Sequence, residues 1–260
     1  MGVDDFLQRS PILHPSLNKG CCVGFRGTPN KPRLIDINRY GFSPVGDNRV
    51  FGMSTRFTDE YSTKELSKRT WPDFEKLFVK QGVVGDGWWC WCMHHHVSSY
   101  SLPENQQPRT RAERAVRNHR QKAELVEKGC AHGILVYAKR EPIGWCQYGL
   151  REELPRADNT QKYRRLALRD GTDKLWRITC FVVDKNYRER GVASAALKAA
   201  LEAIRKKGGG LVEAYPVRKT DQGSNYMYCG TVGMFEKVGF KTIAALATGR
   251  TPTVVMRRTI

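Results

Sequence analysis

The sequence predicts a mixed α/β fold in which helices cover one central sheet. Two observations predict it. From Thr70 onward, apolar stretches of strand length alternate with segments of helical periodicity. In addition, 40% of the 260 residues are hydrophobic, which is enough to build a buried core. Residues 1–53 are rich in Gly, Pro and Asn, so we expect a loop-rich N-terminal extension there and the folded domain over 54–260.

The first half of the folded domain is expected to hold two helices and a hairpin. Thr70 can cap the first helix, and Pro72 suits its first turn. The second helix is expected over 108–127, with a strongly basic polar face. Apolar segments on either side of a polar turn predict an antiparallel hairpin over 134–148.

The second half alternates strands and helices more regularly. A long central strand is expected over 175–183, followed by an Ala-rich helix that opens at Val192 and ends before Gly208. The remaining expected elements are a strand over 211–217, a helix over 227–238 and two strands over 242–247 and 253–256.

The charge of the chain is strongly positive, with 44 Lys and Arg against 26 Asp and Glu and a net charge of +18. This sign points to an acidic partner, namely nucleic acid, an anionic membrane or a polyphosphate cofactor. No apolar run approaches the roughly 18 residues of a membrane helix, and the acidic opening is not a secretion signal. We therefore expect a cytoplasmic protein without membrane contact, whose eight cysteines are reduced thiols.

The sharpest local motif follows the strand expected over 175–183. Arg188-x-x-Gly191-x-Ala193 lies between this strand and the next helix. Small residues at a helix start leave backbone N–H groups exposed, and the helix dipole adds positive charge, so the segment suits a pyrophosphate. A plain tight turn is the alternative. The motif is neither a nucleotide-hydrolysing P-loop nor the three-glycine dinucleotide fingerprint.

Together with later motifs, this segment resembles the GNAT superfamily of N-acetyltransferases. The other parts of the resemblance are Met-Phe-Glu-Lys-Val-Gly-Phe over 234–240, Glu-x-Tyr-Pro-Val over 213–217 and Gly-Thr at 230–231. The chain is also similar to a bacterial GNAT subgroup that carries a Trp-Cys-Trp-Cys-Met-like segment near its first helix. The resemblance covers about two hundred residues and leaves out 1–53.

The resemblance implies a mostly antiparallel sheet with a splayed strand pair that holds acetyl-CoA as co-substrate, with no metal. The pantetheine is then expected beside Phe181, Val182 and Val183. The pyrophosphate is expected at the residues of the helix opening, which are Arg188, Glu189, Arg190, Gly191, Val192, Ala193 and Ser194. Asn225 matches a frequent CoA-contacting Asn of the family, although a helix cap is an equally good interpretation.

Direct transfer from a thioester to an amine requires a polarised carbonyl, a proton for the departing thiolate and a base. The backbone N–H of Val183 is our candidate for the first role. The family often places its acidic Tyr where this chain has Phe235, so Tyr228 and then Tyr226 are the candidate acids. Glu213 is the candidate base, and its alternative role is to pair with a nearby Arg.

An aromatic segment precedes the second expected helix. Cys90, Cys92 and the histidines at 94–96 suggest a metal site, but the Cys-x-Cys spacing argues against zinc. In the resemblance this region lines the acceptor site. Trp88, Trp89 and Trp91, with Tyr215, are therefore our candidate substrate-binding residues, and core packing is the alternative.

The function that this sequence predicts is an acetyl-CoA-dependent N-acetyltransferase acting on an amine of a small molecule or protein. The second hypothesis is a nucleic-acid-binding module that uses the basic helix over 108–127 and the Trp-rich loop. A third hypothesis combines the two: an acetyltransferase that acts on aminoacyl-tRNA or a ribosomal protein would account for both the positive charge and the GNAT-like motifs. The sequence does not specify the acceptor, nor whether the protein is a monomer or homodimer.

Overall fold

The computed structural model describes residues 61–80, 90–96, 108–168, 171, 174–218, 227–247 and 252–260, and every structural statement below concerns these ranges. The predicted extension over 1–53 lies outside them. So do four of the predicted site residues, which are Trp88, Trp89, Asn225 and Tyr226. Within the described ranges, no helix is both long enough and apolar enough to cross a membrane.

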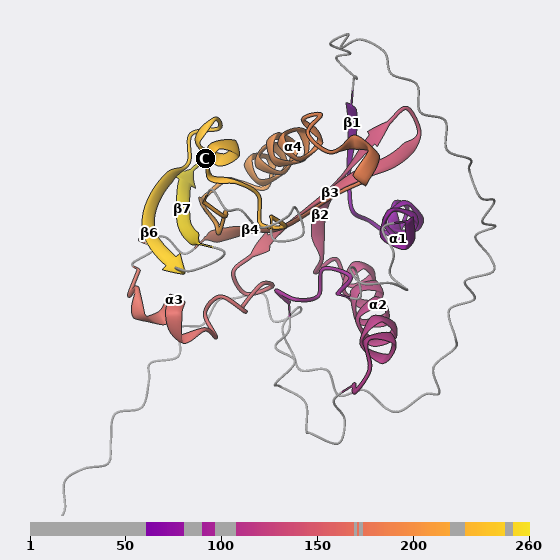
Figure 1. Ribbon diagram of the computed structural model, residues 1–260, viewed down its shortest axis with the longest axis horizontal. Coiled ribbons are helices and arrows are strands. Elements are labelled where there is room, and N and C mark those ends of the chain that lie inside the picture. Colours follow the sequence, from indigo (N-terminus) through magenta and orange to yellow (C-terminus); the bar gives the residue numbers. More distant parts are fainter. Residues whose placement is uncertain are drawn as a thin grey trace, which may run out of the picture.

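The centre of the fold is a seven-stranded sheet in the order β1-β2-β3-β4-β5-β7-β6 (Figure 1). The strands are β1 (Tyr61–Glu65), β2 (His132–Ala138), β3 (Glu141–Leu150), β4 (Leu175–Val183), β5 (Leu211–Ala214), β6 (Lys241–Ala247) and β7 (Thr253–Thr259). Every neighbouring pair is antiparallel except β4 with β5, which is parallel. The predicted mixed, mostly antiparallel α/β fold is confirmed.

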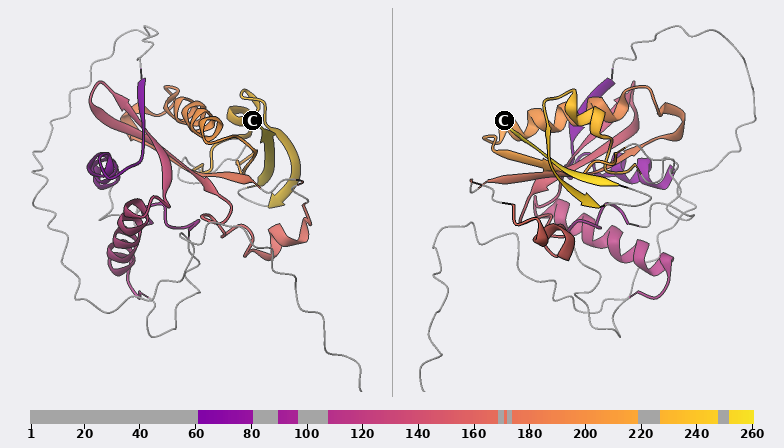
Figure 2. Two further views of the ribbon diagram at one scale, coloured as in Figure 1. Left: turned by 180° about the vertical axis from the view of Figure 1, so that it is seen from behind. Right: turned by 60° about the vertical axis from the view of Figure 1, so that its left-hand side comes forward.

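The helices lie on both sides of this sheet (Figure 2). They are α1 (Trp71–Lys80), α2 (Arg111–Glu127), α3 (Gln161–Arg165), α4 (Val192–Lys206) and α5 (Val232–Glu236), with a short 3-10 turn η4 (Lys185–Tyr187) before α4. The strand predicted over 175–183 and the helix predicted from Val192 match β4 and α4 closely. The sequence analysis missed β1, whose side chains are mostly exposed and polar, and α3, which has only five residues.

Three predicted elements are shorter than expected, and one of them is the helix predicted over 108–127, which begins at Arg111. We predicted a strand over 211–217, but β5 ends at Ala214, and Val217 makes only isolated bridges to Thr231 and Thr253. We predicted a helix over 227–238, but α5 begins at Val232. The reason is that the residues before α5 serve as hydrogen-bond partners for neighbouring segments, since the Val217 N–H donates to the Gly230 carbonyl at 3.0 Å.

A β-bulge in β4 decides which side chains face each layer. Gln147 of β3 pairs with Cys180, whereas the next residue, Tyr148, pairs with Ile178, so Thr179 is the extra residue. As a result Phe181 packs in the core under α4, while Cys180 packs in the opposite core with α1 and α2. The bulge thus aims Phe181 at the α4 side of the sheet.

The described part of the aromatic segment, residues 90–96, does not form a pocket wall. Residues 90–96 form turns, and Trp91 and Cys92 have positive φ values of 44° and 49°. Trp91 is 1% exposed and its ring stacks on Phe78 with centroids 5.5 Å apart. Trp91 therefore packs in the core beneath α1, which corrects its assignment to the substrate pocket.

Most of the described cysteines agree with the expectation of reduced thiols. Cys90, Cys92, Cys146, Cys180 and Cys229 are free, and all but Cys90 are buried. Cys130 is the exception, because it is disulfide-bonded.

A fully buried lysine lies between α2 and the sheet. The ammonium nitrogen of Lys122 is 2.9 Å from Nε2 of His96, and the Gln147 amide nitrogen is also 2.9 Å from that ring nitrogen. Within the described part of the chain, Lys122 makes no ion pair with a carboxylate. Burial lowers the pKa of Lys122 to about 8. The buried ammonium therefore carries a penalty at neutral pH.

We predict that Lys122→Met stabilises the protein at pH 7. Because folding lowers this pKa from 10.5 to about 8, the penalty is absent above pH 10.5, grows as the pH falls, and is constant below pH 8. At about 1.4 kcal/mol per pKa unit, the variant should gain up to about 3 kcal/mol at pH 7, and the gain should vanish toward pH 10.5.

Urea unfolding at pH 7 and pH 10.5 measures this difference. Lys198→Met, at an exposed position of α4, is the matched control and should show no such pH dependence. A Lys122→Met protein that is less stable than the wild type at both pH values would contradict the prediction.

Candidate active site

The site begins where β4 and β5 separate. The two strands pair over only four residues each, from Leu175 to Ile178 and from Leu211 to Ala214, whereas β4 continues to Val183. The predicted splayed strand pair is therefore present. In the gap, the Phe181 N–H donates to the Tyr228 carbonyl at 2.6 Å.

The Val183 N–H points into the same gap. Asp184 donates its N–H to the Ile143 carbonyl of β3 at 2.9 Å. Because successive amides of a strand point to opposite neighbours, the N–H of Val183 points away from β3, as that of Phe181 does. The open edge of β4 therefore offers a backbone donor near its carboxyl end.

The loop after β4 is held from both sides. Asp184 caps η4 by accepting the Asn186 N–H at 3.0 Å, and its other carboxylate oxygen lies 2.7 Å from the Lys80 ammonium of α1. The Tyr61 hydroxyl of β1 donates to the Arg190 carbonyl at 3.0 Å. Contacts to α1 and β1 thus fix the path of the chain into α4.

The opening of α4 has the geometry of an anion site. Gly191 adopts φ +83°, a left-handed conformation that favours glycine, and a Cβ there would meet no atom within 4 Å. The first intrahelical bond runs from the Ala195 N–H to the Gly191 carbonyl, so the three amides from Val192 to Ser194 have no intrahelical acceptor. These amides and the helix dipole suit a phosphate group.

The position of α4 depends on a glycine of β3. A Cβ on Gly144 would lie 2.4 Å from Cγ1 of Val192, which is the first residue of α4. Only glycine at this position allows the helix opening to sit this close to the sheet. Gly144 therefore sets the distance between the helix opening and β4.

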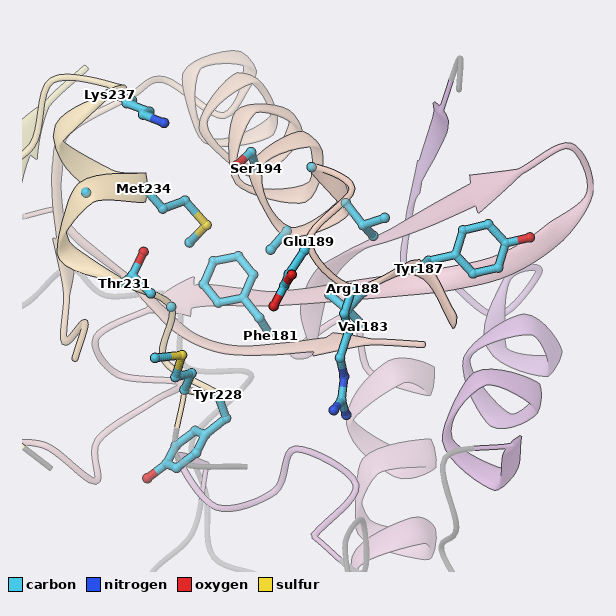
Figure 3. Close-up of a pocket in the computed structure, with 16 residues that line it drawn as sticks. Phe181, Val183, Tyr187, Arg188, Glu189, Ser194, Tyr228, Thr231, Met234 and Lys237 are labelled. Atoms are coloured by element: carbon cyan, nitrogen blue, oxygen red, sulfur yellow. The ribbon is translucent and has the colours of Figure 1, made fainter. Parts of the chain in front are cut away.

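A cavity of about 630 Å³ connects the α4 opening with the gap beside β4 (Figure 3). Its predicted lining residues are Phe181, Val183, Arg188, Glu189, Gly191, Val192, Ala193, Ser194 and Tyr228. Val182 faces the opposite core instead, and Arg190 is not part of the lining. The lining residues that the sequence analysis missed are Tyr187, Met227, Gly230, Thr231, Gly233, Met234 and Lys237.

Some of these missed residues had a signal in the sequence. Met234 and Lys237 belong to the Met-Phe-Glu-Lys-Val-Gly-Phe motif, and their spacing of three places them on one side of a helix. Phe235, at the position where the family often has Tyr, is fully buried and packs on Phe181, so it does not line the cavity.

Tyr228 lies at one end of the cavity. Its side chain projects to the side of β4 opposite Ser194 and Lys237 (Figure 3), and it is 40% exposed. The neighbouring Cys229 and partial burial raise the pKa of Tyr228 above its usual value. The hydroxyl group is therefore protonated at neutral pH and available as a proton donor.

Glu213 lies in a buried ionic cluster rather than in the cavity. Its carboxylate accepts hydrogen bonds from the Tyr163 hydroxyl at 2.7 Å and the Tyr215 hydroxyl at 2.5 Å. The Arg257 Nε donates to it at 2.8 Å, and the Arg177 Nε lies 3.7 Å away. Both Glu213 and Tyr215 are buried and neither lines the cavity. These contacts favour the alternative in which Glu213 pairs with arginine, and they place Tyr215 in the interior.

Replacement of Glu213 distinguishes a structural role, as a partner of arginine, from a catalytic role as the base. We predict that Glu213→Gln lowers the free energy of unfolding by about 3 to 5 kcal/mol, because it removes the buried carboxylate that compensates the charges of Arg257 and Arg177. The pH dependence of kcat/KM in the folded variant should stay that of the wild type. Denaturant unfolding and pH profiles measure both effects.

The control is Glu202→Gln, which breaks an exposed pair with Arg205 on α4 and should change stability by less than about 0.5 kcal/mol. A Glu213→Gln variant of normal stability that loses activity and the acidic limb of its rate profile would instead make Glu213 the base.

Among the described residues, no group of three or more His, Cys, Asp or Glu side chains is arranged to hold a metal ion. This includes the Cys90, Cys92 and His94–His96 segment, where the spacing had already argued against zinc.

Comparison with known proteins identifies the class. The model of the acetyltransferase (GNAT) family matches residues 93–240, which is more than half of the chain. The chain therefore belongs to the GNAT acetyltransferase family. It is an acyltransferase that uses acetyl-CoA as co-substrate, as the resemblance implied.

Three solved structures illustrate the similarity. A GNAT-family acetyltransferase from Streptococcus pneumoniae is 13% identical, with a TM-score of 0.42 over 77% of this chain and 99% of the other. An N-acetyltransferase from Staphylococcus aureus Mu50 is 11% identical, with a TM-score of 0.44 over 77% and 98%. The PaiA N-acetyltransferase from Thermoplasma acidophilum, in complex with coenzyme A, is 12% identical, with a TM-score of 0.42 over 77% and 99%. No curated protein matches the chain.

Proposed function

We propose that the protein transfers the acetyl group of acetyl-CoA directly to an amine of a small molecule or a protein. One observation carries this proposal. A single cavity joins the amide-rich opening of α4 to the open edge of β4, where the Val183 amide and Tyr228 lie. Such a cavity offers a place for the phosphates and a place for the reacting thioester in one continuous site.

The residues of this chain fit acetyl-CoA. The amides from Val192 to Ser194 are suited to the pyrophosphate, and Gly191 leaves the space above them open. Arg188 and Lys237 add two positive charges to the lining. Part of the net charge of +18 therefore serves the co-substrate.

Two groups at the edge of β4 support acyl transfer. The Val183 N–H is aimed into the gap, where it can donate to the thioester carbonyl and stabilise the negative charge that develops on its oxygen. The Tyr228 hydroxyl is protonated and can donate its proton to the departing thiolate.

The nearby cysteines support direct transfer rather than a covalent enzyme intermediate. Cys180 and Cys229 are buried and neither lines the cavity. Burial raises the pKa of Cys229 to about 12, so its thiol stays protonated. A nucleophilic cysteine requires an accessible thiolate, which these residues do not provide.

The first test of the proposed function is Gly191→Glu. A side chain here fills the open space at the α4 opening and places a carboxylate where the pyrophosphate is proposed to bind. Like charges in contact cost several kcal/mol, so the affinity for acetyl-CoA should fall by about a hundredfold or more. Calorimetric titration of the purified variant measures this affinity.

The matched control is Gly129→Glu. Gly129 also has a positive φ, of 69°, and open space around its Cβ position, but it lies at the end of α2. This variant has comparable backbone strain and should bind acetyl-CoA like the wild type. Unchanged affinity in Gly191→Glu, or an equal loss in both variants, would contradict the proposed pyrophosphate site at the α4 opening.

The second test is Tyr228→Phe, which removes only the proposed proton donor. We expect kcat to fall by about a hundredfold or more, with little change in the KM for acetyl-CoA. Tyr187→Phe is the control, because Tyr187 lines the same cavity without a proposed role in proton transfer. Steady-state rates with an accepted amine measure kcat in both variants. If both variants lost the same activity, or if Tyr228→Phe kept the full kcat, Tyr228 would not be the proton donor.

A further inference from the structure

Lys237 is a cation of the cavity lining that takes no part in the proposed acyl transfer. Lys237 follows α5 and lines the wall that faces the α4 opening. Figure 3 shows Lys237 and Tyr228 at opposite ends of the site, with Met234 and Thr231 between them. Lys237 therefore lies away from the atoms that react.

The ammonium group of Lys237 is available to a ligand. Its side chain is exposed, and within the described ranges no ion pair or side-chain hydrogen bond involves it. The backbone of this turn is fixed by ordinary bonds, including the Lys237 N–H to the Gly233 carbonyl at 3.3 Å. Lys237 thus has no structural partner that would account for its charge.

Charges in the cavity are distributed unevenly. Glu189 is the one carboxylate among the described lining residues, and it lies on the loop before α4, on the other wall from Lys237 (Figure 3). Lys237 attracts a phosphate group. The amides of the α4 opening suit the pyrophosphate, so Lys237 is left for a different anionic group of the same ligand.

We propose that Lys237 binds the 3′-phosphate on the ribose of CoA, and so makes the enzyme prefer CoA to dephospho-CoA. The inference rests on the proposed function. A terminal phosphate monoester is a compact dianion, and the ammonium of lysine matches it as a mobile point charge with three donors. Since the residue is exposed, solvent screening keeps the contribution moderate.

The experiment is a pair of calorimetric titrations, one with CoA and one with dephospho-CoA, which differ only in the 3′-phosphate. The wild type should bind CoA about three- to tenfold more tightly than dephospho-CoA. In Lys237→Gln this ratio should fall to about one, with the affinity for dephospho-CoA unchanged. Lys237→Arg keeps the charge and should retain most of the preference.

Lys198→Gln is the matched control. Lys198 is exposed on α4, one turn beyond Ser194, and does not line the cavity. The substitution removes the same charge close to the same ligand, and it should leave the ratio at the wild-type value. Thermal unfolding of each variant verifies that the fold is intact.

Each other result overturns a specific claim. If Lys237→Gln weakens both ligands equally, Lys237 binds the pyrophosphate and the inference is wrong. If the wild type binds both ligands equally, the inference fails while the proposed function stands. If the folded wild type binds neither ligand, the proposed function itself fails.

Discussion

The short parallel pairing of β4 with β5 is the constraint on which the rest of the site depends. The two strands share four pairs of residues and then separate, so β4 has an unpaired edge from Thr179 to Val183. An unpaired strand edge inside a domain needs other hydrogen-bond partners. Tyr228 supplies one by accepting the Phe181 N–H, and the amide of Val183 faces the cavity. The same gap thus organises the backbone and exposes the groups that the chemistry needs.

The buried ionic cluster lies directly beside the last paired residues of these strands. Arg177 of β4 is opposite Glu213 of β5 in the register, and Asp158 from the preceding connection binds the Arg177 guanidinium at 2.6 Å. Tyr163 of α3 reaches the same carboxylate. A single buried charge cluster therefore ties α3 and its connection to the two strands just before they separate. We infer that it fixes where the gap begins, which is a structural contribution to the site.

Local sequence signals predicted the parts of the site that local structure determines. The apolar run of β4, the Ala-rich α4 and the Gly191 motif between them lie within thirty-two residues, and the structure places them as expected. The partners of Glu213 are different, because Arg177 and Arg257 are thirty-six and forty-four residues away in the sequence. Similarly, the sequence allows Trp91 to line a pocket or to pack in the core. Trp91 packs in the core because Phe74 and Phe78 of α1 lie against its ring. Long-range packing has no signature in one sequence.

Gly144 illustrates how far from a ligand the geometry of a binding site is determined. It belongs to β3, contributes no atom to the cavity wall, and acts only by leaving room for Val192. A mutational library confined to ligand-facing positions would pass over it, although any larger residue there would displace the helix opening. Attempts to change the acyl-donor specificity of this enzyme should therefore keep Gly144 unchanged and treat β3 as part of the scaffold that supports the binding site.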